Sequence, residues 1–109
     1  MEIKKKLFNP VQVKKWYRRL NMLKRKPVKA VLKRLVANHK DKYTVTELVI
    51  LNNPLTQSEI SRALADLREM DLVFFQKEGK WVYYKINFPR YLKLKAVITR
   101  LKDQYDHNA

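Results

Sequence analysis

The strongest constraint on the fold is a helix-start signal that occurs twice in the middle of the chain, with a helix breaker between its two copies. Thr44 with Glu47, and Thr56 with Glu59, have the spacing of a capping box, in which the hydroxyl and the carboxylate each bind a free backbone N–H. Pro54 lies between the copies and keeps the residue before it out of helical geometry. The pattern predicts two short helices joined by a tight turn, which is a helix-turn-helix.

The second of these helices is expected to have one buried and one exposed face. Its apolar residues Ile60, Leu64 and Leu67 recur at i, i+4 and i+7, which places them on the side that meets the core. The polar residues are left facing outward: Gln57, Ser58, Ser61, Arg62 and Asp66.

A β-hairpin is predicted directly after the helix-turn-helix. Residues 72–75 and 81–86 are rich in β-branched and aromatic side chains, and the turn between them holds Gly79, the chain's only glycine. The turn also carries Lys77 and Lys80, so the hairpin has a basic tip, as the wing of a winged-helix domain does. The aromatic residues of the second strand are expected to pack against the core and the other strand, in preference to forming a base-stacking platform: Trp81, Tyr83 and Tyr84.

Three further amphipathic helices are predicted around this unit, each opened by a proline. One starts near Pro27 and runs to about Asn38, and one starts at Pro10 after a capping Asn9. The last starts at Phe88 and Pro89. The first and last helices each carry one apolar stripe: Val13, Trp16, Leu20 and Leu23 in the first, and Leu94, Val97, Ile98, Leu101 and Tyr105 in the last.

The two terminal stripes lie outside a core that the middle of the chain already completes. A two-fold dimer would bury both, and the expected dimer interface consists of Trp16, Leu20, Leu23, Leu94, Val97, Ile98, Leu101 and Tyr105. The alternative is that the first and last helices pack against each other within one chain.

The expected fold is therefore mainly α-helical with one small β-hairpin, in the order of four helices, two strands and a last helix. Its 109 residues suit a single winged-helix DNA-binding domain spanning 1–109. Within it, residues 1–26 form a basic N-terminal arm and helix, 27–88 the winged-helix core, and 89–109 a C-terminal dimerisation helix.

The middle of the chain also resembles a known family. The matching motifs are Val45-Thr46-Glu47-Leu48, Gln57-Ser58, Ser61-Arg62-Ala63-Leu64, Leu67-Arg68-Glu69, Leu72-Val73, Glu78-Gly79-Lys80 and Tyr83-Tyr84-Lys85-Ile86. Over residues 26–88 these resemble the ArsR-type winged-helix repressors. The resemblance implies the element order given above, and a small dimeric transcription factor of bacteria or archaea.

Four departures from the family pattern stand out. Ala63 replaces a frequent His, Asp71 replaces a frequent Gly, and the turn before Pro54 is one residue longer than usual. The metal-sensing members carry Cys pairs or His and acidic ligands, whereas this chain has no Cys and its last helix offers only Asp103 and His107. We therefore expect no metal and no cofactor.

The charge distribution indicates a polyanionic partner. The formal net charge is +15, and residues 1–40 hold 14 Lys and Arg against one acidic residue, a net of +13. We expect sequence-specific binding of double-stranded DNA by a homodimer at an inverted-repeat operator, in the cytoplasm at the nucleoid. The helix from Gln57 to about Met70 would enter the major groove N-terminus first.

Each predicted DNA contact follows from the chemistry of its side chain. Base edges are assigned to Gln57, Ser58, Ser61 and Arg62, since Arg suits guanine and Gln suits adenine. Phosphate contacts are assigned to Thr44 and Thr46 at the start of the preceding helix. The wing would reach backbone or minor groove through Lys77 and Lys80.

Other function classes explain less of the sequence. Non-specific binding, as in a chromatin or RNA-associated protein, accounts for the charge but not for the polar start of the recognition helix. Membrane-surface association through Trp16 and Tyr17 leaves the rest of the chain unexplained, and no apolar stretch is long enough to span a membrane. No nucleophile with a base, glycine loop or histidine pair suggests an enzyme.

Overall fold

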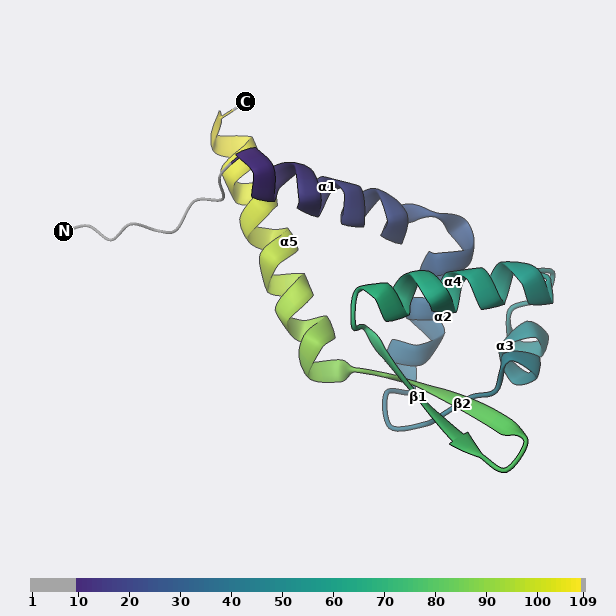
Figure 1. Cartoon of the computed structure of the whole chain (residues 1–109). Helices are drawn as coiled ribbons and strands as arrows, with labels where there is room; N and C mark the ends of the chain where they lie inside the picture. The colour runs from purple at the N-terminus through teal and green to yellow at the C-terminus, as the bar shows by residue number, and fades with distance from the viewer. Residues whose placement is uncertain (1–9, 109) are drawn as a thin grey trace.

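The computed structural model describes the backbone of residues 10–108 and the side chains of residues 10–103 (Figure 1). The protein is mainly helical, with one two-stranded antiparallel hairpin, in the predicted order. Asn9, the expected cap of the first helix, lies outside the described residues. The elements are α1 (Pro10–Lys24), α2 (Lys26–Ala37), α3 (Val45–Leu51), α4 (Gln57–Glu69), β1 (Val73–Glu78), β2 (Trp81–Ile86) and α5 (Phe88–Asn108).

Both predicted capping boxes are present. The Oγ1 of Thr44 accepts from the N–H of Glu47 at 3.1 Å, and the Glu47 carboxylate accepts from the N–H of Thr44 at 2.8 Å. Thr56 and Glu59 form the same pair of bonds at 3.2 and 2.9 Å. Each box satisfies two backbone donors that a helix start would otherwise leave free, which fixes where α3 and α4 begin.

The end of α4 is fixed by a Schellman motif. The N–H of Leu72 donates to the carbonyl of Leu67 and the N–H of Asp71 donates to that of Arg68, both at 2.9 Å. Asp71 has a φ of +59°, a left-handed conformation that favours glycine. Asp71 stands where the family often has Gly, and this chain therefore has a side chain at a position whose backbone is left-handed.

The core lies between α2, α4 and the hairpin. The apolar face of α4 is completely buried, as predicted, and Ala63 belongs to it as well. Leu48 of α3 closes one end of this core. The other fully covered side chains come from α2, the α4–β1 junction and β2: Val28, Val31, Leu35, Leu72 and Ile86.

The hairpin has a two-residue loop and a short third partner. Glu78 pairs with Trp81, so that Gly79 and Lys80 form the loop. Gly79 has a φ of +63° and Lys80 does not have a positive φ, as in the type II′ turn that fits the twist of a hairpin. Tyr43 and Tyr84 exchange two backbone hydrogen bonds of 2.9 and 2.7 Å, a pairing that the sequence did not predict.

The terminal helices contribute to the core, contrary to the expectation that the core is complete without them. Leu94 of α5 is 6% exposed and belongs to the core cluster, and Trp16, Leu23 and Ile98 pack against that cluster. Part of each apolar stripe is therefore buried against the core of the same chain, and burial of the remainder in a dimer stays a prediction. Figure 1 shows α1 and α5 extending together to one side of the winged-helix core.

Candidate nucleic-acid interface

The N-terminal half of α4 presents a polar surface to solvent. Gln57, Ser58, Ser61 and Arg62 are all exposed, and their spacing places them on neighbouring positions of one side of the helix. The opposite side is held in the core by Ile60 and its neighbours. The structure thus brings the four predicted base-reading residues together on a helix whose rotation is fixed.

The two threonines predicted at the start of α3 differ in their surroundings. Thr44 is buried, and both its hydroxyl and its N–H are bonded to Glu47. Those groups hold the helix start, so the predicted phosphate contact of Thr44 is not supported. Thr46 is exposed in the first turn of α3, and its predicted phosphate contact stays a prediction.

The two lysines of the wing are exposed. Lys77 precedes the end of β1, and Lys80 lies in the loop with its Nζ 5.4 Å from the ring centroid of Trp81. Figure 1 shows the hairpin projecting below α4, with its loop as the outermost point. The two lysines therefore lie at the free end of the element that projects furthest beside α4.

Two cationic side chains that sequence reasoning missed hold the wing in place. The guanidinium of Arg68, near the end of α4, lies 4.0 Å from the ring centroid of Phe75. On the α2–α3 loop, Lys42 pairs with Glu78 and lies 4.7 Å from the ring centroid of Tyr83. Cation–π contacts of this kind contribute about 0.5–1 kcal/mol each at exposed sites. The hairpin is thus held from the side of α4 and from the side of the α2–α3 loop.

The acidic residue of α4 that was predicted to face outward is paired instead. Asp66 accepts from Arg25, between α1 and α2, at 3.3 Å. The pair links α4 to the N-terminal helices, so Asp66 is not part of the DNA-facing set. No local pattern signals this contact, because the partners are 41 residues apart.

The aromatic residues of β2 divide between packing and exposure. Tyr84 packs against the core and lies 6.4 Å from Phe75 across the strands, and Tyr83 meets Lys42. The predicted packing against the core and the other strand is present for Tyr84, whereas the contact of Tyr83 is with a loop residue. Trp81, at the tip, is 49% exposed, so its ring is only partly covered.

The predicted dimer-interface residues fall into three groups. Leu94 and Leu101 are buried within the chain, which removes them from any surface that a partner could touch. Tyr105 lies in α5, but its side chain is outside the described part. The remaining five are half-buried: Trp16, Leu20, Leu23, Val97 and Ile98.

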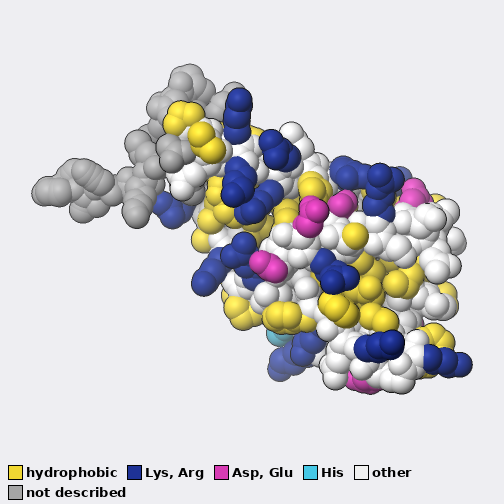
Figure 2. Space-filling view, viewed as in Figure 1, with side chains coloured by type: hydrophobic (Ala, Val, Ile, Leu, Met, Phe, Trp, Pro, Cys, Tyr) yellow, Lys and Arg dark blue, Asp and Glu magenta, His cyan; other side chains and the backbone are white. Residues whose placement is uncertain are grey.

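The face of the molecule seen in Figure 2 is basic. Figure 2 shows Lys and Arg side chains spread over this face, with few acidic side chains among them. Among the side chains described, no three His, Asp or Glu residues gather at one place. No helix in the described part of the chain is long and apolar enough to cross a membrane.

Comparison with known proteins agrees with this geometry. The chain is similar to the transcriptional regulator HlyU of Vibrio vulnificus CMCP6, with 31% identity, a TM-score of 0.55, and coverage of 79% of this chain and 82% of that one. This chain belongs to the ArsR-type winged-helix regulators. HlyU of Vibrio cholerae N16961 is 26% identical over 84% of this chain and 90% of that one, with a TM-score of 0.57.

A solved structure with lower sequence identity also has a similar fold. The ArsR-like regulator from Rhodococcus sp. RHA1 is 17% identical over 87% of this chain and 86% of its own, with a TM-score of 0.65. No family model and no curated protein sequence matches the chain. In this ArsR-type protein, α3 and α4 form the helix-turn-helix and β1 and β2 the wing.

Proposed function

We propose that the protein is a homodimeric repressor that binds a specific sequence of double-stranded DNA. The observation that carries this proposal is the exposed polar face of α4, opposite a face that is locked into the core. A helix held in this way can enter the major groove with its N-terminal residues against base edges. The ArsR-type likeness supports DNA binding and transcriptional regulation as the general role.

Base recognition is assigned to the first two turns of α4. Arg62 has a guanidinium whose two donors match the two major-groove acceptors of guanine, and Gln57 matches the acceptor and donor of adenine. Ser58 and Ser61 lie beside them and accommodate close approach of the helix. None of these side chains has a hydrogen bond or an ion pair within the described chain that would have to be broken on binding.

Phosphate contacts are assigned to the elements on either side of α4. Thr46 lies at the start of α3, and Lys77 and Lys80 lie on the wing. With six or more phosphates neutralised, affinity should fall roughly 10³-fold or more between 50 and 200 mM salt. The basic segment 1–26 would add contacts to the backbone, and 27–88 would form the reading core.

Dimerisation is assigned to the half-buried part of the α1 and α5 stripes. Leu20 and Val97 are only partly covered and are not among the residues packed on the core cluster. Two copies related by a two-fold axis would cover them, with 89–109 as the dimerisation helix. The operator is then an inverted repeat with half-sites about one helical turn apart.

The experiment is fluorescence anisotropy with a duplex from the gene's own upstream region, beside a scrambled duplex, across a salt series. We expect strong preference for the upstream duplex, at two chains per duplex. If both bind equally, selection from a random duplex library would show whether any sequence is preferred.

The second candidate function is non-specific nucleic-acid binding, which the net charge of +15 favours. A library selection that enriches no sequence would establish it and exclude the proposed operator. A selected motif that is an inverted repeat would support the proposal directly.

A further inference from the structure

The hairpin of the wing has an inner face on the core and an outer face that carries exposed aromatic rings. Val73 and Ile86 are paired across the strands and are both buried, which fixes the inner face. Because side chains alternate between the two faces of a strand, the outer face consists of Phe74, Gln76, Glu78, Trp81, Tyr83 and Lys85. In Figure 1 no helix lies on the side of the hairpin that is away from α4.

Three rings of the outer face lie at neighbouring positions of the sheet. Phe74 is 56% exposed and Trp81 is 49% exposed, while Tyr83 is half-buried. Trp81 and Tyr83 are two residues apart on one strand, a spacing of about 7 Å, and Phe74 is the diagonal neighbour of Tyr83 at about 7–8 Å. Successive bases of a duplex strand are only about 3.4 Å apart. Rings at this spacing therefore suit bases that are spread apart, which an unpaired strand can offer and a duplex cannot.

The charges around the rings suit a phosphate backbone. Glu78 is the only acidic residue of the outer face, and Lys42 of the α2–α3 loop pairs with it. Lys85 is exposed on the same face, and the Nζ of Lys80 lies 5.4 Å from the ring centroid of Trp81. Cationic side chains among exposed rings are the arrangement by which many proteins hold a single strand.

Two of the rings have an ammonium group over them that a base would displace. Lys80 lies over Trp81, and the Nζ of Lys42 lies 4.7 Å from the ring centroid of Tyr83. A base stacked on an aromatic ring is bound more strongly than an ammonium group at an exposed site. The base would therefore take the ring, and the displaced lysine would contact a neighbouring phosphate.

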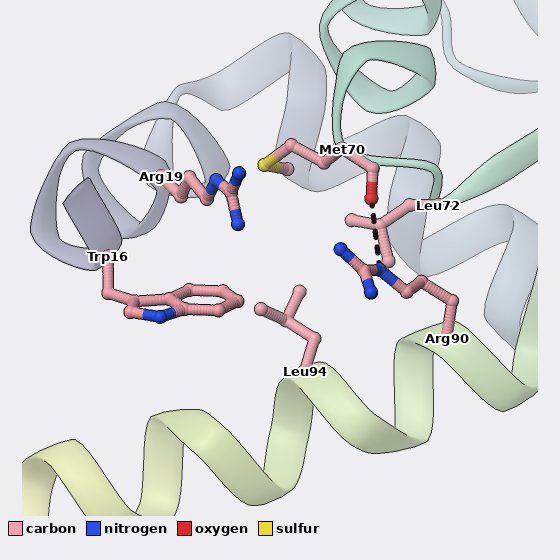
Figure 3. A pocket seen from close by; sticks show the side chains of 6 residues that line it. All are labelled: Trp16, Arg19, Met70, Leu72, Arg90 and Leu94. Atoms are coloured by element: carbon pink, nitrogen blue, oxygen red, sulfur yellow. Dashed lines mark hydrogen bonds between the residues drawn. The ribbon is translucent and has the colours of Figure 1, made fainter. Parts of the chain in front are cut away.

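The base of the hairpin is held in place, so the outer face is preorganised. Just before β1, the Nε of Arg90 donates to the carbonyl of Met70 at 3.4 Å, next to Leu72 (Figure 3). The space among the side chains drawn there has room for about one water molecule, so this junction is closely packed. Just after β2, the N–H of Asn87 donates to the carbonyl of Leu72 at 2.8 Å and its side chain donates to that of Asp71 at 2.9 Å. A surface held in this way loses little conformational freedom when a ligand binds.

We propose that the outer face of the wing binds single-stranded DNA, with unpaired bases stacked on its three rings and phosphates beside its lysines. This would be a second mode of DNA binding, used where a duplex is opened into separate strands. We choose DNA because the wing adjoins the face of α4 that is assigned to DNA, and that choice rests on the proposed function. The stacking of unpaired bases does not.

The test is fluorescence anisotropy of the full chain with a labelled oligothymidine of about 12 nucleotides, a length within the site sizes of single-strand binders, at about 0.15 M salt. The comparison strand has the same length and the same phosphates but carries no bases. Because the two strands have equal charge, the difference between their Kd values measures the stacking of bases. We expect oligothymidine to bind at least about tenfold more tightly. Equal affinities would overturn the proposal without depending on any variant.

Substitutions then locate the site. Trp81→Leu and Phe74→Leu should each weaken the binding of oligothymidine by about fivefold or more and leave the binding of the abasic strand unchanged. Phe75→Leu is the matched control, because Phe75 is also about half exposed and follows Phe74 in the strand, but lies on the inner face. It should bind oligothymidine as the wild type does. An equal loss in Phe75→Leu, or no loss in either outer-face variant, would overturn the assignment to the outer face.

The outcomes also separate this proposal from the proposed function. If no duplex sequence is preferred and oligothymidine binds through Trp81, the proposed function fails and the single-strand site stands. If the operator is bound and the abasic strand binds as tightly as oligothymidine, the reverse holds. An oligouridine that binds more tightly than oligothymidine would overturn the choice of DNA.

Discussion

At the scale of single residues, Arg62 should contribute most to base preference. It is exposed in the second turn of α4, where its guanidinium can reach a guanine. Arg62→Ala should weaken binding to the selected operator by about 1–3 kcal/mol and relax the preference at one base position. The measurement is anisotropy against the operator and its single-base variants.

Lys77→Ala is the matched control, because it also removes one exposed positive charge. It should weaken all duplexes alike and reduce the slope of the salt dependence by about one. An Arg62→Ala chain that distinguishes the base variants as well as wild type does would show that α4 does not read that position.

Asp71 is the residue where backbone conformation and side chain conflict. Its φ of +59° favours glycine, and its carboxylate lies at the negative end of the α4 dipole. Asp71→Gly should therefore raise the free energy of unfolding by roughly 0.5–1 kcal/mol, measured by urea denaturation.

Two further substitutions separate the causes. Asp71→Asn removes the charge and keeps a side chain that tolerates the left-handed region, so it should give a smaller gain. Asp71→Ala keeps the conformational cost and should gain less than Asp71→Gly. A less stable Asp71→Gly chain would mean that the carboxylate contributes more than the strain costs.

At this scale the sequence predicted interactions between residues close in sequence and missed those between residues far apart in sequence. Both capping boxes could be predicted from the sequence because the two residues of each box are three positions apart. The partner of Asp66 was missed because Arg25 is brought to it by the packing of α2 on α4. Thr44 was assigned to phosphate from its position alone, although a capping hydroxyl is already used.

At the scale of elements, one cation–π pair adds a surface contact between α4 and the wing to the core that they share. The guanidinium of Arg68 lies 4.0 Å from the ring centroid of Phe75, and Phe75 is otherwise half exposed. Arg68→Ala and Phe75→Leu should each lower the free energy of unfolding, and the double variant should show a coupling energy of about 0.5–1 kcal/mol. Chemical denaturation of the four chains measures it.

The same cycle with Arg68→Ala and Tyr83→Leu is the control, because Tyr83 meets Lys42 instead. Its coupling should be close to zero. Additive effects in the Arg68 and Phe75 cycle would show that the wing is positioned by the hairpin's core residues alone.

The element order was predictable because each helix and strand has its own periodicity and its own start or turn signal. The contacts that position the wing were not. Arg68 lies on the exposed, polar face of α4, where a cation is not unusual. Nothing in the sequence shows that the fold of the hairpin brings the ring of Phe75 against its guanidinium. The Tyr43–Tyr84 pairing was likewise hidden, since one backbone partner lies in a loop.

At the scale of the whole molecule, the shape is more extended than the chain length requires. The radius of gyration is 16.1 Å, against about 13 Å for a compact domain of this size, and the principal extents are 55 × 25 × 22 Å. Figure 1 shows α1 and α5 projecting from the winged-helix core. These two helices account for the long dimension of the molecule. Each projecting helix keeps part of its apolar stripe uncovered, which is the condition for a second copy to bind there.

The sequence analysis therefore missed the part of these helices that is buried within the chain, and their role in dimerisation stays a prediction. Leu94 was assigned to a partner and is instead 6% exposed within its own chain, because α1 and α5 close over the end of the core. A stripe is a property of one helix, and it does not show which neighbour covers each residue. Val97 and Leu20 belong to the same stripes and remain half-buried.

This division predicts two separable phenotypes on α5. Val97→Asp should convert the dimer to monomer at micromolar concentration, because it places a charge on the uncovered part of the stripe. Leu92→Asp is the matched control: Leu92 is 50% exposed and lies about 140° away around the helix, so the dimer should persist. Leu94→Ala should instead lower the free energy of unfolding by about 2–5 kcal/mol. Sedimentation equilibrium gives the molar mass, and a dimeric Val97→Asp chain beside a monomeric Leu92→Asp chain would place the interface on the outer face of α5.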